Sequence, residues 1–280
     1  MREPIPVGRV QSLPDREMQR NYLNQGKPVV VAGGASTWPA ARWTPEVLRA
    51  KAGSAKVLTH RSDTPYFGLD EKHGGPKLKE EEMTLDAFVS TAFAPPSNNI
   101  YYYLQRASIP DRLPALLDDL RMPVGVDPKK IYLINLWFGP ANNITRLHYD
   151  VPNNFLVHLY GRKRITLFSP QDTARLYPFR TKAYNMSQTD IDKPDFERFP
   201  KLAEAQPYEA EIGPGDMLYI PPYWWHQVYS LEIGISANYW WMPRISQYFA
   251  PQLPDVFVDV ARAVMQRVTH PQPAPAIPTH

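Results

Sequence analysis

Residues 144–168 read ITRLHYDVPNNFLVHLYGRKRITLF and contain three short runs rich in β-branched and aromatic residues. The runs, 144–149, 155–160 and 163–168, are bounded by Asn, Pro and Gly, which is typical of β-strands. Gly161 separates the second run from the third tightly enough to predict a hairpin between them. The segment therefore predicts antiparallel β-structure.

Six further runs of the same kind lie on both sides of this segment, at residues 100–104, 131–138, 208–212, 217–220, 226–231 and 233–240. A second dense turn, Gly213-Pro214-Gly215-Asp216, lies between two of them. Nine short strands in succession predict a mainly β fold, a sandwich or barrel. We expect neighbouring strands to run antiparallel.

The chain has a different character on the N-terminal side of the barrel segment 98–242. Residues 1–97 predict mixed α/β structure, with a helix over 15–24 and a buried strand over 29–31. Thr44 is a good N-cap for a second helix that begins with proline. These elements are expected to flank the barrel.

The C-terminal side predicts helices over residues 243–270 and a disordered tail over 271–280, which has four prolines in ten residues. Apolar side chains share one helix face at Phe257, Val260, Ala261, Val264 and Val268. That face must be covered, either by the barrel or by a second subunit. We expect it to form a homodimer contact.

Composition limits the classes of function. The chain has 280 residues, no cysteine, and 31 basic against 28 acidic side chains, a net charge of +3. Without thiolates, any metal must be held by nitrogen and oxygen. The basic residues alternate with acidic ones, which argues against a nucleic-acid partner. The chain lacks both an apolar run of spanning length and a signal core in residues 1–10, so we expect a cytoplasmic protein without membrane association.

The strongest candidate for chemistry is His148-Tyr149-Asp150, the one place where a carboxylate follows a histidine by two residues. Side chains two apart on a strand point to the same face, so His148 and Asp150 would both project into the barrel. A later strand carries His226, which an antiparallel return could place opposite this pair. Two histidines and one carboxylate leave open positions on an iron(II) ion, and zinc is the competing metal.

Other polar side chains lie near this motif on apolar strands. Lys163 follows the Gly161 turn, and its ammonium could reach the same cavity and neutralise the carboxylate of a co-substrate. A solvated basic turn is the alternative for that lysine. Polar groups that need partners if buried are also present at Tyr103, Thr145, Asn154 and Asn238.

The chain resembles the cupin-type JmjC oxygenases, and among them the asparaginyl hydroxylases of hypoxia-inducible factor. The resemblance spans residues 28–241. It rests on the motifs TRLHYD (145–150), NF (154–155), GRKR with LF (161–168), DFERFP (195–200) and YIPPYWWH (219–226). It implies a double-stranded β-helix, or jelly-roll, that uses Fe(II), 2-oxoglutarate and O₂.

Roles are implied for ten residues. His148, Asp150 and His226 match the iron ligands, which are also the catalytic centre. Residues that match the 2-oxoglutarate site are Lys163, Tyr103, Thr145, Asn154 and Asn238. Gln105 and Trp240 match positions on the substrate side.

One departure concerns the substrate. Residues 184–188 read YNMSQ where the asparaginyl hydroxylases grip their peptide with an acidic residue, an arginine and a glutamine. The expected function is hydroxylation of a protein or peptide side chain, with succinate and CO₂ as co-products. A small metabolite or modified nucleoside, demethylation at the same site, and a non-enzymatic ligand-binding cupin are the alternatives.

Overall fold

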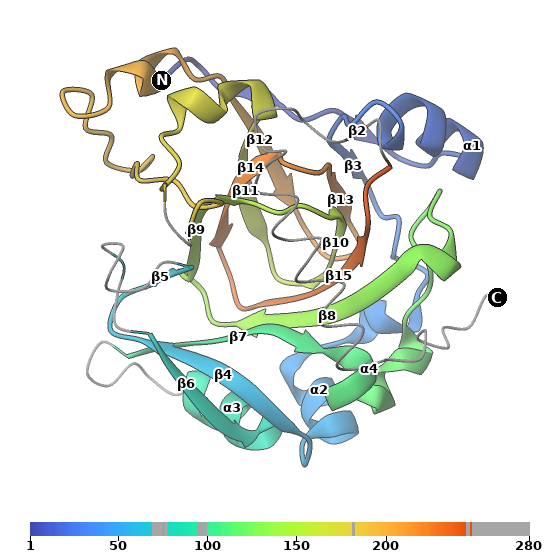
Figure 1. The fold of residues 1–280 in the computed structure, drawn as a ribbon. Coiled ribbons are helices and arrows are strands. Elements are labelled where there is room, and N and C mark those ends of the chain that lie inside the picture. The colour runs from blue at the N-terminus through green and yellow to red at the C-terminus, as the bar shows by residue number, and fades with distance from the viewer. Residues whose placement is uncertain (69–74, 76–77, 94–99, 181–182, 245–246, 248–280) are drawn as a thin grey trace.

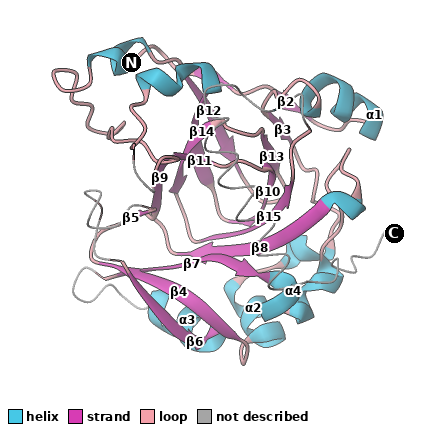
Figure 2. Cartoon of the chain, in the orientation of Figure 1, coloured by secondary structure: helices cyan, strands magenta, loops and turns pink. Residues whose placement is uncertain are grey.

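The structure is a computed structural model that describes residues 1–68, 75, 78–93, 100–180, 183–244 and 247. Two β-sheets wrap around a central space, and α2, α3 and α4 cover the outer side of the larger one (Figure 1). Strands dominate the centre and helices lie at the periphery (Figure 2).

The nine-stranded sheet has the order β2 (Arg9–Val10), β3 (Val29–Val31), β13 (Met217–Ile220), β10 (Asn153–Tyr160), β15 (Gly234–Trp241), β8 (Ile131–Gly139), β7 (Tyr101–Ser108), β4 (Lys56–Ser62) and β6 (Lys79–Thr84). The six-stranded sheet has the order β1 (Ile5–Pro6), β12 (Pro207–Ile212), β11 (Lys163–Phe168), β14 (Trp225–Ser230), β9 (Ile144–Tyr149) and β5 (Tyr66–Phe67).

The helices are short. They are α1 (Asp15–Met18), α2 (Pro45–Ala52), α3 (Leu85–Ala92) and α4 (Ile109–Arg112). A π-helical turn continues α1 over Gln19–Leu23, and single 3-10 helices cover Pro39–Arg42, Pro114–Asp119, Pro128–Lys130, Pro170–Arg175 and Pro200–Glu204. None of the helices in the described ranges is long and apolar enough to cross a bilayer.

The strands from β8 to β15 form the expected jelly-roll. Within this segment β8, β10, β13 and β15 belong to one sheet and β9, β11, β12 and β14 to the other, and every pair among them is antiparallel. All nine strands expected from residues 100–240 are present, with ends that differ by a few residues. The mainly β prediction is confirmed.

The predicted hairpin at Gly161 is wrong. Strand β10 pairs with β13 and β15, whereas β11 pairs with β12 and β14, so the turn carries the chain from one sheet to the other. Gly161 is required there because φ is +76° and a Cβ would lie 1.9 Å from the Ile233 carbonyl oxygen. The Gly213–Asp216 turn also connects facing sheets, since β12 and β13 do not pair.

The N-terminal region joins the same framework. The predicted helix over 15–24 is α1 with its π-helical turn, and the predicted strand over 29–31 is β3. Thr44 caps α2 by accepting a hydrogen bond from the Val47 amide at 3.2 Å. Strands from both sides of position 97 belong to the same sheet. The predicted domain limits at residues 97, 242 and 270 stay a prediction. The C-terminal helices, the tail and the homodimer contact lie outside the described residues, apart from residues 243, 244 and 247.

His158 lies in the core of β10 and makes the stability of the fold depend on pH. Burial, followed by the nearby charge of Lys163, lowers the pKa of His158 to about 3. The unfolded chain therefore binds a proton at a higher pH than the folded protein does. The stabilising contribution of the neutral ring is complete above about pH 6.5 and is lost as the pH falls towards 3.

We expect His158→Gln to flatten the acid side of the stability profile. Glutamine can keep the hydrogen bond that Ser236 Oγ shares with His158 Nδ1 at 2.8 Å, and it does not titrate. Between pH 6.5 and 4.5 the wild type should lose up to about 2.7 kcal/mol more than the variant. Urea titrations at several pH values measure this. His60→Gln is the control and should have a smaller effect, because Glu80 opposes the lowering of the His60 pKa by burial. Equal slopes for wild type and His158→Gln would contradict the assignment.

Candidate active site

A cavity of about 340 Å³ brings together all ten residues singled out from the sequence. The six-stranded sheet and the residue after β9 supply Thr145, His148, Asp150, Lys163 and His226. The nine-stranded sheet supplies Tyr103, Gln105, Asn154, Asn238 and Trp240. Each sheet contributes half of the set, so the cavity depends on the closure of the jelly-roll.

His148, Asp150 and His226 converge on one point. Their ligand atoms all lie within 4.8 Å of one another. Strands β9 and β14 pair so that His226 lies directly opposite His148, with ring centroids 4.2 Å apart. His226 Nε2 lies 3.7 Å from Asp150 Oδ2. The antiparallel return expected from the sequence therefore closes the cluster.

Backbone carbonyls fix the tautomers of both histidines. His148 Nδ1 lies 2.7 Å from the Arg146 carbonyl oxygen, and His226 Nδ1 lies 2.9 Å from that of Trp224. A carbonyl oxygen only accepts, so each Nδ1 must donate, which leaves the Nε2 lone pair available to a metal. Burial, with a smaller contribution from His148, lowers the pKa of His226 to about 4, so the ring is neutral at physiological pH. This donor set fits iron(II).

A β-bulge brings Thr145 and His148 to the same cavity. Residues three apart on a regular strand point to opposite faces, but β9 has two residues, 146 and 147, opposite the single residue Gln227 of β14. The side chain of Gln227 completes the bulge by accepting a hydrogen bond from the Leu147 amide at 3.1 Å. Gln227 was not predicted from the sequence to have a role in the site.

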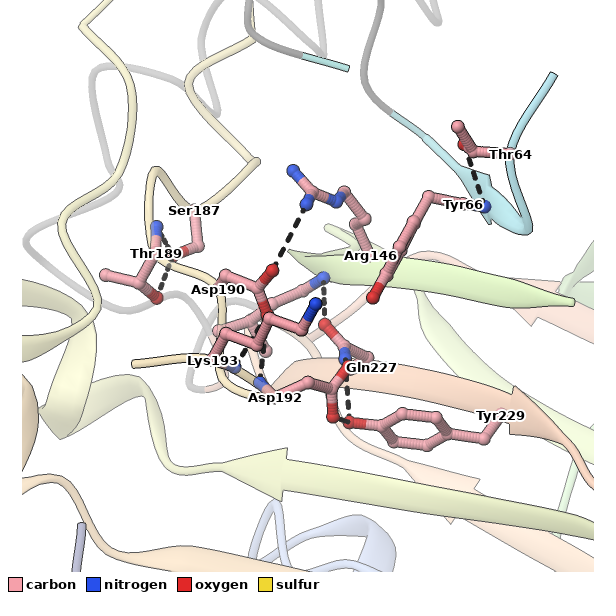
Figure 3. Close-up of polar contacts among 11 residues, drawn as sticks. Thr64, Tyr66, Arg146, Ser187, Thr189, Asp190, Asp192, Lys193, Gln227 and Tyr229 are labelled. Atoms are coloured by element: carbon pink, nitrogen blue, oxygen red, sulfur yellow. Dashed lines mark hydrogen bonds and ion pairs between the residues drawn. The ribbon is translucent and has the colours of Figure 1, made fainter. Parts of the chain in front are cut away.

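A polar network holds Gln227 in place (Figure 3). Gln227 Nε2 donates to Asp192 Oδ2 at 2.9 Å, and the Tyr229 hydroxyl donates to Asp192 Oδ1 at 2.7 Å. Arg146 lies over the Tyr66 ring at 4.8 Å and 3.6 Å from an Asp190 oxygen. The segment that contains both aspartates is thus tied to the two strands that carry the histidines.

We expect Gln227→Leu to weaken metal binding without touching a ligand. The change leaves the buried Leu147 amide without its acceptor, which costs about 1–3 kcal/mol of stability. Misplacement of His148 should lower the affinity for Fe(II) or Co(II) by about 10- to 100-fold. Thermal melts and anaerobic metal titrations test both effects. Tyr229→Phe is the control, because it keeps the hydrogen bond from the Leu147 amide to Gln227. Equal losses of metal affinity in the two variants would refute the role of the bulge.

Lys163 is buried in the cavity without a counter-ion. It is 2% exposed, and its Nζ lies 3.4 Å from the Tyr103 hydroxyl. In the described ranges no carboxylate forms an ion pair with this ammonium. A buried cation of this kind is costly unless an anion reaches it. The second carboxylate of 2-oxoglutarate would supply that anion, so the residues fit the co-substrate.

Two amide oxygens in the cavity also lack partners. Asn154 Oδ1 and Asn238 Oδ1 are buried, and within the described part of the chain neither accepts a hydrogen bond. Buried polar groups left unsatisfied call for a ligand or water as partner. Further lining residues that the sequence did not single out as site residues include Arg106, Trp137, Asn185 and Met186.

A larger groove of about 710 Å³ lies elsewhere and has different chemistry. Its described lining includes Ile5, Lys27, Tyr208 and Trp224, and none of these described residues is a carboxylate. Trp224 Nε1 donates to the Gly26 carbonyl oxygen at 3.0 Å. Size alone would select this groove, but the metal-ligating cluster lies in the smaller cavity.

Comparison with known proteins identifies the family. The family model described as "Cupin-like domain" matches residues 14–247. The chain is 32% identical over 227 residues to lysine-specific demethylase 8 of Xenopus tropicalis, covering 79% of this chain and 49% of that protein. It is 33% identical to lysine-specific demethylase JMJ30 of Arabidopsis thaliana, covering 79% and 51%. It is 30% identical to tRNA wybutosine-synthesizing protein 5 of Gallus gallus, covering 79% and 72%.

These comparisons support the broader resemblance, not a specific likeness to the asparaginyl hydroxylases. The chain spans about half the length of the curated demethylases it matches. The match to the family model, over residues 14–247, includes the whole jelly-roll and its metal-ligating cluster. The chain belongs to the cupin-like domain family.

Proposed function

We propose that this protein is a 2-oxoglutarate-dependent oxygenase that hydroxylates a side chain of a protein or peptide. The observation that carries the proposal is that one cavity holds both the His148, Asp150 and His226 cluster and the ammonium of Lys163, which forms no ion pair with any residue that the structure describes. A metal alone would explain the cluster. The buried cation supports an anionic co-substrate as well.

Different residues of the cavity would bind the metal, the co-substrate and the substrate. His148 and His226 would bind Fe(II) through Nε2 and Asp150 through its carboxylate, which leaves positions for 2-oxoglutarate and O₂. Lys163, with the hydroxyls of Tyr103 and Thr145, would bind the far carboxylate. Asn154 and Asn238 would hydrogen-bond ligands beside the metal, and Gln105 and Trp240 would face the substrate. Leu156, Ile220 and Val228 supply apolar lining that limits access of water.

Bound iron would supply the activation of O₂, which is chemistry that the side chains lack. The overall reaction balances as substrate C–H, 2-oxoglutarate and O₂ giving C–OH, succinate and CO₂. Decarboxylation of the keto acid provides two electrons to O₂ and the C–H bond provides two. One oxygen atom enters succinate and the other enters the product. The protein orients the substrate and shields the oxidant.

Anaerobic loading with Fe(II) and 2-oxoglutarate, followed by O₂, tests the proposal. Succinate should form, and peptides that contain a substrate sequence should increase its rate and gain one oxygen in mass. The absence of succinate with every peptide, and without one, would refute it. A ligand-binding cupin that is not an enzyme would bind 2-oxoglutarate without consuming it.

The names of the relatives give two other candidates for the same site. Demethylation would release formaldehyde from a methylated lysine peptide, as the names of two relatives suggest. Hydroxylation of a modified nucleoside follows from the relative named for wybutosine synthesis, of which the chain covers 72%. Formaldehyde assays and tRNA substrates in the same experiment separate these candidates.

A further inference from the structure

Arg106 has an unusual backbone at the mouth of the cavity. It lines the cavity, its side chain is exposed, and its φ is +51°. The pairing of β7 with β8 is shifted between Leu104 and Ala107, so Gln105 and Arg106 lie in an irregularity of the strand. A left-handed residue other than glycine costs free energy, and bulges near active sites redirect side chains. This geometry aims an arginine at the mouth.

The mouth carries an exposed positive charge. Across the described ranges the side chain of Arg106 forms no ion pair or hydrogen bond, and it is exposed. Asp150, a metal-ligand candidate, is the one carboxylate residue among the described lining residues. The substrate side therefore offers a positive charge that a ligand can reach.

We propose that Arg106 selects an acidic peptide, in which a carboxylate lies next to the side chain that is oxidised. This inference rests on the proposed function and narrows its substrate class. The guanidinium would bind the carboxylate, which it can do with two parallel hydrogen bonds.

A methylated lysine does not fit this mouth. Its cation would lie near a guanidinium, and the described walls offer no free carboxylate to balance it. Such cations are normally held over aromatic faces or beside acids. The names of the demethylase relatives would suggest a methylated lysine as substrate, and the charge at this mouth does not suit that substrate.

A polynucleotide fits less well than a peptide. Arg106 is the one exposed lysine or arginine among the described lining residues, because Lys163 is buried. One guanidinium can bind a single carboxylate, whereas a chain of phosphates is bound by several cations.

Direct binding to the full-length, metal-free chain tests the proposal independently of turnover. The probes are a fluorescent pool of short peptides with one Asp or Glu next to a random position in a neutral background, a matched pool with trimethyl-lysine in place of that acidic residue, and a single-stranded RNA. The acidic pool should bind at least about fivefold more tightly than the trimethyl-lysine pool. Arg106→Gln should remove this preference, and Arg106→Glu should reverse it.

Two further variants separate recognition from folding. Arg106→Gly removes the side chain and suits the left-handed backbone, so it should melt at or above the wild-type temperature and lose the preference. Arg112→Glu makes the charge reversal on an exposed arginine outside the lining of the cavity and should keep it. Equal binding of the two peptide pools, tighter binding of RNA, or a preference unchanged in Arg106→Glu would overturn the proposal. Selective binding without any succinate would refute the proposed function alone.

Discussion

Asp150→Asn is expected to abolish succinate formation and to lower Fe(II) affinity by more than the roughly 100-fold seen for changes outside the ligand set. The amide keeps the shape of the side chain and removes the charge that balances the metal. Asp150 is the best ligand to change, because the rings of His148 and His226 pack against each other at 4.2 Å and either truncation would also disturb the cavity.

The fold should survive this substitution. The Asp150 side chain is 21% exposed, and the backbone bond from the Tyr223 amide to the Asp150 carbonyl oxygen, at 2.8 Å, does not involve it. Anaerobic titration with Fe(II) or Co(II) measures affinity, and circular dichroism checks folding. Asp118→Asn, on an exposed aspartate outside the cavity, is the control and should match the wild type. Normal turnover in Asp150→Asn would exclude the metal centre.

The metal cluster was predictable because it depends on strand periodicity. The two-residue spacing of His148 and Asp150 fixes a shared face once residues 144–149 form a strand. His226 required only an antiparallel partner for that strand, which the alternation of short runs and turns made the best expectation. The pairing of His226 with His148 confirms it.

Strand partners were not predictable from the turns. A glycine with positive φ permits a sharp reversal at position 161, but it does not say whether the next strand pairs beside β10 or crosses to the facing sheet. Burial decides which of these two arrangements forms. Every residue of β10 from Asn153 to Leu159 is buried, so both faces of this strand are covered. Short-range turn chemistry does not contain that information.

The edge strand β6 and the two bulges could not be predicted from the sequence for a different reason. Strand β6 contains three consecutive glutamates and has poor β-propensity, and it forms because β4 pairs with it over six residues. The bulges at residues 146–147 and 105–106 have no glycine to mark them. They depend on partners far away in the chain, Gln227 for the first and β8 for the second.

Lys163→Met is expected to stabilise the protein while removing its affinity for 2-oxoglutarate. The variant replaces a buried cation that lacks a counter-ion with an apolar side chain of similar length. Exchanges of this kind are neutral or stabilising by about 1–4 kcal/mol. Loss of the charged partner should weaken 2-oxoglutarate binding by at least about 30-fold, or 2 kcal/mol.

The opposite signs of the two effects distinguish a binding residue from a structural one. Lys51→Met is the matched control: Lys51 Nζ lies 2.7 Å from Asp119 Oδ2, and that carboxylate is largely buried. Removing Lys51 should lower the free energy of unfolding, because a buried charge loses its partner, and should leave 2-oxoglutarate binding unchanged. Urea unfolding and calorimetric titration of 2-oxoglutarate into the metal-loaded protein measure both quantities. A Lys163→Met protein that is less stable and binds the keto acid normally would show that the ammonium serves the fold and not the co-substrate.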